Sequence, residues 1–116
     1  MVLTRLRMCV VMGMIAVPAA AGESLAIRVM PGAGFAPSDV IVESLIEPHT
    51  RNRSVAVEID SANFYTSSTT ELEGERAPRA VVMRFRKLPA GSYEARVTLV
   101  GTDGQRGYVM RTFTLW

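Results

Sequence analysis

Reactive and cross-linking residues are scarce in this 116-residue chain, which contains one cysteine, Cys9, and one histidine, His49. A single cysteine forms neither an internal disulfide nor a cysteine-based zinc site. One imidazole with a single nearby carboxylate supplies at most two metal ligands, fewer than a zinc centre requires. The composition therefore predicts no metal and no cofactor, and we expect His49 to be a solvated loop residue.

The chain beyond its N-terminal segment also lacks an excess of positive or negative charge. Arg5 and Arg7 precede an apolar run over residues 8–17, and Pro18 and three alanines follow it. This order is typical of a cleaved secretory signal, and the run is too short to span a bilayer. Without the two arginines, 11 of the 13 basic residues remain against 11 acidic ones. The rest of the chain is nearly neutral, which argues against nucleic acid as a partner.

We accordingly expect residues 1–21 to be a cleaved secretory signal peptide that takes Cys9 with it. Residues 22–116 then form a single exported domain, periplasmic or extracellular, that does not span the membrane after cleavage. A domain of this length is large enough to bury a modest core.

The mature segment shows no sustained helical period and no internal repeat, but a repeated two-residue alternation of apolar and mostly polar positions. Such alternation is typical of half-buried antiparallel strands. We expect strands over residues 25–29, 40–46, 55–59, 81–86, 93–100 and 106–116, with one or two weaker ones between 63 and 78. Turn residues separate them, including Asp103-Gly104, a favoured hairpin dipeptide. The sequence therefore predicts an all-β fold, an antiparallel sandwich or small barrel of about seven strands.

The segment Leu88-Pro89-Ala90-Gly91-Ser92-Tyr93 has the form Leu-x-x-Gly-x-Tyr and leads into an alternating strand. It resembles the tyrosine corner of immunoglobulin-like and fibronectin type III-like β-sandwich domains. The resemblance implies that the Tyr93 ring packs under the corner and that its hydroxyl bonds to upstream backbone, with Leu88 and Gly91 as the other structural residues of the motif. It also implies that Asp103-Gly104 joins the last two strands.

The chain departs from antibody domains, because it lacks a cysteine pair and its single tryptophan is Trp116, the last residue. The resemblance therefore points to the bacterial or fibronectin-like kind of sandwich, with Trp116 buried or at the rim of the last strand. Since this fold hosts adhesion, spacer, chaperone and binding roles alike, the resemblance implies no one function.

Phe64 and Tyr65 are the candidate ligand-binding residues. We expect them to end one strand, and as neighbours they face opposite sides, so that one ring is in the core and the other exposed. An exposed ring beside the hydroxyl-rich residues 66–70 could stack on a sugar, as in a small carbohydrate-binding module. It could instead be half-covered by the adjacent loop.

The remaining polar residues form no recognisable catalytic set. The closely spaced Glu71, Glu73 and Glu75 lack the Asp and Asn of a calcium loop and favour a solvated edge. The candidate nucleophiles have no Gly-x-Ser-x-Gly context and no base nearby in the sequence; they are Ser67, Ser68 and Ser92. We therefore expect no enzymatic activity.

Arginines at polar strand positions could form a weak docking surface for an anionic glycan or an acidic protein. In the topology that the resemblance implies, Arg84 and Arg86 lie on one sheet and Arg96 on the other, which breaks a continuous patch; Arg111 could join either group. The simpler interpretation is cross-strand pairing with acids such as Glu43, together with protection of sheet edges.

The sequence thus favours a non-enzymatic exported module that acts in protein–protein interaction or as a structural or accessory domain of the cell envelope. The expected partner is another envelope or secreted protein. An edge strand of the domain could bind it by pairing with a strand of the partner. The alternative is a small carbohydrate-binding module with a glycan as its ligand.

Overall fold

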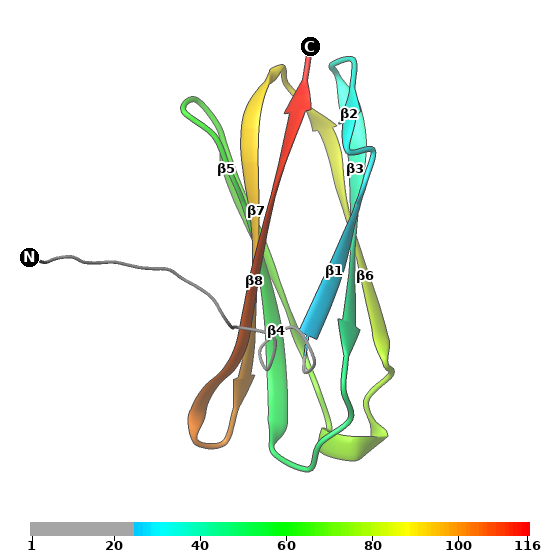
Figure 1. Ribbon diagram of the computed structural model, residues 1–116, viewed down its shortest axis with the longest axis vertical. Helices are drawn as coiled ribbons and strands as arrows, with labels where there is room; N and C mark the ends of the chain where they lie inside the picture. Colours follow the sequence, from blue (N-terminus) through cyan, green and yellow to red (C-terminus); the bar gives the residue numbers. More distant parts are fainter. Residues whose placement is uncertain (1–24) are drawn as a thin grey trace, which may run out of the picture.

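A computed structural model describes residues 25–116 of the chain (Figure 1). The predicted signal peptide and Cys9 lie outside the described residues. Within them, no helix is long and apolar enough to cross a membrane.

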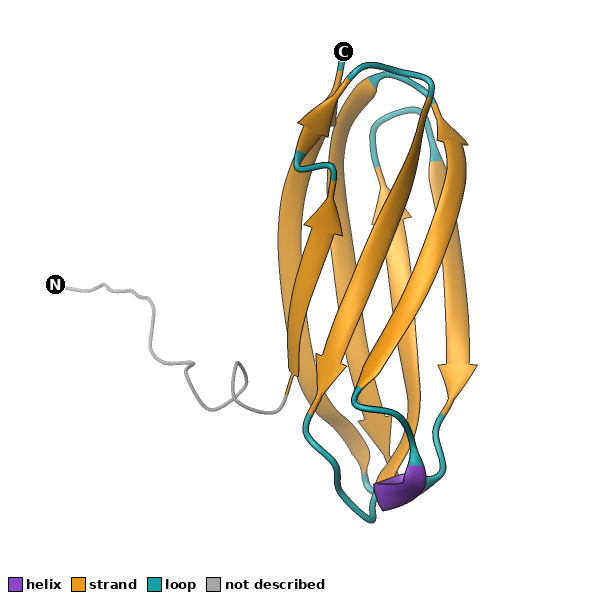
Figure 2. Cartoon of the chain, turned by 90° about the vertical axis from the view of Figure 1, so that its right-hand side faces the viewer, coloured by secondary structure: helices purple, strands orange, loops and turns teal. Residues whose placement is uncertain are grey.

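The described chain forms eight strands and one short 3-10 helix. In chain order these are β1 (Leu25–Met30), β2 (Ala33–Gly34), β3 (Ser38–Ile46), β4 (Asn52–Asp60), β5 (Tyr65–Glu71), the 3-10 helix η1 (Gly74–Arg76), β6 (Ala80–Leu88), β7 (Gly91–Gly101) and β8 (Gly104–Leu115). They make a small sheet in the order β1-β3-β6 and a large sheet in the order β2-β8-β7-β4-β5. The sheets face each other as two layers, with η1 at one end (Figure 2). The predicted all-β sandwich is confirmed, with eight strands where about seven were expected.

The core lies between the sheets and follows the alternation of the sequence. Every second residue of β4 and β7 is buried, and the same holds for β3 and β6. All strand pairs are antiparallel except β2 with β8. The hairpin between β7 and β8 turns at Thr102-Asp103, and Gly104 adopts a φ of 113°, a conformation that favours glycine. The Asp-Gly signal therefore marked the correct hairpin.

Two edge segments differ from the sequence-based expectation. The chain leaves the small sheet after β1 and adds β2 to the large sheet, parallel to the end of β8, where only a turn was expected. The expectation that Phe64 and Tyr65 end a strand was wrong, because β4 ends at Asp60 and Tyr65 begins β5. The Ser61 N–H donates to the Phe64 carbonyl at 2.8 Å and closes the turn between them.

Tyr93 occupies the corner at which the chain passes from β6 in the small sheet to β7 in the large one. Its side chain is buried, and its hydroxyl donates a 2.6 Å hydrogen bond to the Pro89 carbonyl, four residues upstream. The ring stacks on Phe113 at a centroid distance of 4.9 Å and meets Phe64 edge to face at 6.4 Å. Leu88, also buried, ends β6, and Gly91 begins β7. The corner thus combines a hydrogen bond with aromatic packing.

Replacement of Tyr93 by Phe should lower the free energy of unfolding by about 1–3 kcal/mol, because the Pro89 carbonyl loses its donor while the ring packing remains. Denaturant unfolding measures this cost. Tyr108→Phe, at an exposed position of β8, is the matched control and should change stability by less than about 0.5 kcal/mol. Equal stability of the Tyr93 variant and the wild type would show that the hydrogen bond does not hold the corner.

Candidate functional site

The outer side of the small sheet carries an unusual set of side chains, which we call the small-sheet face. Cross-strand pairing arranges them in three rows. The rows are Ala26–Leu45–Ala80, Arg28–Glu43–Val82 and Met30–Ile41–Arg84. Six of these nine positions are apolar. An antiparallel sheet that turns its outer side to water normally carries polar residues there.

The apolar side chains of this face remain accessible. Met30, Leu45 and Val82 are between 38% and 60% exposed, and they lie in neighbouring rows. Single exposed apolar residues are ordinary, but a contiguous group rimmed by charge is typical of an interaction site. This small-sheet face is therefore the leading candidate for a functional surface.

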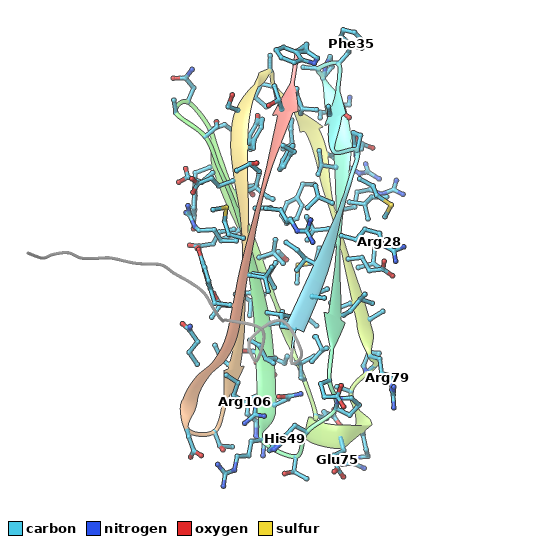
Figure 3. The ribbon with its side chains drawn as sticks, in the orientation of Figure 1. Arg28, Phe35, His49, Glu75, Arg79 and Arg106 are labelled. Carbon is cyan, nitrogen blue, oxygen red and sulfur yellow. The ribbon has the colours of Figure 1, made fainter. Side chains whose placement is uncertain are left out.

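The charges on and around the small-sheet face are mainly positive. Arg28 lies 3.7 Å from Glu43; the arginine side chain is largely solvated, whereas that of Glu43 is mostly covered. Arg84 and Arg86 make no ion pair within residues 25–116. Arg79, which precedes β6, projects from the same side of the sandwich as Arg28 (Figure 3). The small-sheet face thus combines exposed apolar side chains with a basic rim of arginines on its edge strands, around Glu43 at the centre.

The outer side of the large sheet has the opposite charge, and we call it the large-sheet face. Its central rows run across β5, β4, β7 and β8. They are Tyr65–Asp60–Glu94–Thr112, Ser67–Glu58–Arg96–Met110 and Thr69–Ala56–Thr98–Tyr108. Three carboxylates and one arginine leave this face negative.

Arg96 organises the charges of the large-sheet face. Its guanidinium donates to Glu58 at 3.3 Å, to Asp60 at 3.2 Å and to Glu94 at 2.9 Å. The hydrogen bonds to Asp60 and then to Glu58 raise the pKa of Arg96, so it stays charged. A single cation therefore holds three carboxylates together, and the cluster keeps an excess of negative charge.

The two predicted ligand-binding residues do not form one site. Phe64 is half-buried and packs on Tyr93, whereas Tyr65 is exposed on the large-sheet face. The Tyr65 hydroxyl donates to Glu58 at 2.8 Å, and this bond to a carboxylate raises the pKa of Tyr65. Phe64 instead borders a groove of about 290 Å³ between β5 and β6, together with residues that include Ser68 and Arg86.

A pair of exposed aromatic residues lies at one end of the sandwich. The Trp116 N–H donates to the Gly34 carbonyl at 2.8 Å, and the Ala36 N–H donates to the Trp116 carbonyl at 2.9 Å. These two bonds flank Phe35 and place it directly opposite Trp116 in a parallel pairing. Phe35 is 79% exposed and Trp116 69%, so Trp116 lies at the rim.

The other sequence candidates are dispersed. His49 lies in the turn before β4, at the end of the sandwich near η1 (Figure 3), and its Nδ1 accepts the Arg51 N–H at 3.0 Å. Within residues 25–116, no three His, Cys, Asp or Glu side chains form a group that could hold a metal ion. The positions of the remaining candidates are as follows: Ser67, Ser68 and Glu71 on β5, Glu73 before η1, Glu75 in it, Ser92 and Arg96 on β7, and Arg111 on β8. As expected, Arg84 and Arg86 lie on the other sheet from Arg96.

Sequence reasoning missed both the small-sheet face and the aromatic pair. A signal for the former existed in the uninterrupted apolar runs Val40-Ile41-Val42 and Val81-Val82-Met83, because a strand that is apolar on both faces is usually covered on both. The pairing of Phe35 with Trp116 had no local signal, since the two residues are distant in sequence.

Replacement of Glu58 by Gln should lower the pKa of Tyr65 toward its ordinary value of about 10, because the charged acceptor is lost. Because the pKa of Tyr65 is raised in the folded state, its hydrogen bond to Glu58 stabilises the fold below about pH 10. That stabilisation is lost as the pH rises through the raised pKa of Tyr65. NMR titration of isotope-labelled tyrosine rings measures the effect. Glu94→Gln, which loses a contact to Arg96 but none to Tyr65, is the control; an equal shift in both variants would contradict the assignment.

No model of a known protein family matches the chain, and no curated protein sequence matches it. Several solved structures are similar to it in fold. A superoxide reductase (neelaredoxin) from Ignicoccus hospitalis has a TM-score of 0.60 at 12% identity, over 80% of this chain and 80% of that chain. A variant of that protein has a TM-score of 0.62 at 12% identity, over 85% of this chain and 92% of that one.

A family 76 glycoside hydrolase from a bovine Bacteroides thetaiotaomicron strain has a TM-score of 0.54 at 12% identity. The match covers 78% of this chain but 20% of the hydrolase, so it concerns one part of a longer protein. At such identity the likeness shows the fold alone, and that fold is an immunoglobulin-like β-sandwich.

Proposed function

We propose that this chain is a non-enzymatic, exported β-sandwich module that binds another protein of the cell envelope through its small-sheet face. The observation that carries the proposal is the apolar content of that face, six of nine outward positions in three adjoining rows. The signal-like N-terminal segment supports export to the periplasm or the extracellular space.

The size of the small-sheet face suits a weak, reversible contact. Covering about 300 Å² of apolar surface contributes roughly 7 kcal/mol at about 25 cal/mol per Å². Association costs about 4–15 kcal/mol in lost freedom and ordering, so most of this gain is offset. The basic rim adds attraction for a partner of negative charge and raises the rate of encounter.

The sheet face suits partner binding better than the sheet edges do. Strand addition requires an accessible edge, which the small sheet offers at β6. Arg84, Arg86 and Lys87 lie on this edge strand and are exposed, and charged side chains on an edge strand oppose pairing with another chain. We therefore assign the contact to the face and not to the β6 edge.

The test is capture of partners with the full chain, expressed with its own N-terminal segment in its native host and carrying a C-terminal tag. Val82→Glu should reduce the recovery of specific partners at least about tenfold, because it puts a charge in place of the most exposed of the large apolar side chains of this face. Ala62→Glu, in the exposed turn between β4 and β5, is the matched control and should capture normally.

The variant must be folded for this comparison to be valid. The new carboxylate lies opposite Glu43, and this like-charge pair costs less than about 1 kcal/mol, which thermal unfolding checks. Partners that bind wild type and Val82→Glu equally would refute the assignment to the small-sheet face.

Carbohydrate binding is the second candidate function, and the exposed Phe35–Trp116 pair favours it. Two exposed aromatic residues on paired segments of backbone offer surfaces on which sugar rings can stack. We prefer this pair to Phe64, which is half-buried against Tyr93, and to Tyr65, whose hydroxyl is bound to Glu58.

If the aromatic pair binds glycans, Phe35→Ala should weaken retention in affinity electrophoresis on polysaccharide gels by roughly five- to tenfold. Tyr65→Ala is the control and should migrate as the wild type does. Retention that depends on Tyr65 and not on Phe35 would assign sugar stacking to Tyr65, as the sequence suggested. Absence of retention on every polysaccharide would reject carbohydrate binding.

A further inference from the structure

We infer that the small-sheet face binds the large-sheet face of a second copy of this chain, so that copies stack front to back. The inference rests on the proposed function, because it uses the same small-sheet face and takes the protein bound there to be a second copy of this chain. It follows from a comparison of the two outer faces, which are complementary in charge and each partly apolar.

The charges of the two faces are opposite in sign. The three rows of the small-sheet face hold Arg28, Arg84 and one acid, Glu43. Around them lie the basic residues Arg86 and Arg79 and a second acid, Asp39. The large-sheet face holds three carboxylates and only Arg96. Basic and acidic residues of the domain as a whole nearly balance, so the charge is separated between two sides of the molecule. Such separation favours contact between unlike faces and opposes contact between like faces.

The negative charge of the large-sheet face is available to a partner. The Glu58, Asp60 and Glu94 side chains are 40%, 40% and 51% exposed, whereas that of Arg96 is 23% exposed. The hydrogen bonds to Arg96 use one oxygen of Asp60 and one of Glu94. The second oxygen of each carboxylate can therefore accept a bond from an arginine of another copy.

Apolar side chains lie beside the charges on both faces. Met30, Leu45 and Val82 form the accessible apolar part of the small-sheet face. On the large-sheet face, Tyr108 and Met110 project from neighbouring rows of β8 and are each 43% exposed. Methionine and tyrosine are common in protein interfaces because they adapt to a partner surface and bury much area.

The same charges disfavour a symmetric dimer. A two-fold dimer would place each face against its own copy, so that the arginine-rich rim of the small-sheet face meets the same rim. The front-to-back arrangement places that rim on carboxylates. Because the two faces lie on opposite sides of the sandwich, each added copy leaves one face of each kind free, and the assembly is open-ended.

The expected affinity is low. Two strands of nine residues and one of six cover at most roughly 15 by 30 Å, which is below the size of a standard interface. Ion pairs at an exposed rim are weakened by salt. We therefore expect association at high micromolar concentration and low ionic strength, with less of it as salt is added.

Sedimentation velocity over a concentration series tests the inference, using full-length wild type, Val82→Glu and Tyr108→Arg. The first variant blocks the small-sheet face, and the second places a positive charge on the large-sheet face. We expect the mass of the wild type to rise steadily with concentration and each variant alone to stay monomeric. An equimolar mixture of the two variants should form a 1:1 dimer and nothing larger, because only one pair of intact faces remains. Ala62→Glu should behave as the wild type.

A wild type that stays monomeric at low salt, or a mixture of the two variants that fails to dimerise, would overturn the inference. Homotypic dimers of either variant would overturn it as well, because they indicate a symmetric contact. The proposed function is judged separately: Val82-dependent capture of a different protein by a monomeric wild type would retain that function and reject self-stacking. If the wild type neither self-associates nor captures a partner in a Val82-dependent way, both the proposed function and self-stacking are rejected.

Discussion

The sandwich depends on a corner at which the chain crosses from one sheet to the other. At this point β6 ends in the small sheet and β7 begins in the large sheet, and Tyr93 fixes the crossing from inside. Its hydroxyl holds the Pro89 carbonyl, and its ring joins Phe113 of β8 to Phe64 of the turn before β5. One side chain thus connects the corner, β8 and the turn that leads to the edge strand β5.

The fixed relation of the sheets gives the molecule two outer faces of different chemistry. Alternation sends one set of side chains inward on every strand, so the character of each outer face depends on the other set. On β1, β3 and β6 that set is mostly apolar with arginines at its rim, whereas on β4 and β7 it is dominated by Arg96 and its three carboxylates. The two outer faces therefore differ in both charge and apolar content.

The sequence was sufficient to predict the parts of the fold that local patterns encode. Alternation located the long strands, Asp103-Gly104 marked the last hairpin, and the motif around Tyr93 indicated the class of sandwich. It was insufficient for β2, because two residues carry no periodicity, and for the start of β5, because a polar edge strand resembles a loop. The Phe35–Trp116 pair also escaped prediction, since parallel pairing joins segments about 80 residues apart, and no local pattern encodes such a contact.

The parallel pairing of β2 with β8 has a mechanical consequence. β2 follows the first strand of the sandwich, and β8 is its last, so their hydrogen bonds link the two ends of the fold. Because the strands run in the same direction, tension applied at the two ends slides them past each other and loads these bonds together, rather than opening them one after another. The additional bonds between Trp116 and the Gly34–Ala36 segment share that load. The pairing therefore opposes separation of the two ends of the sandwich under tension.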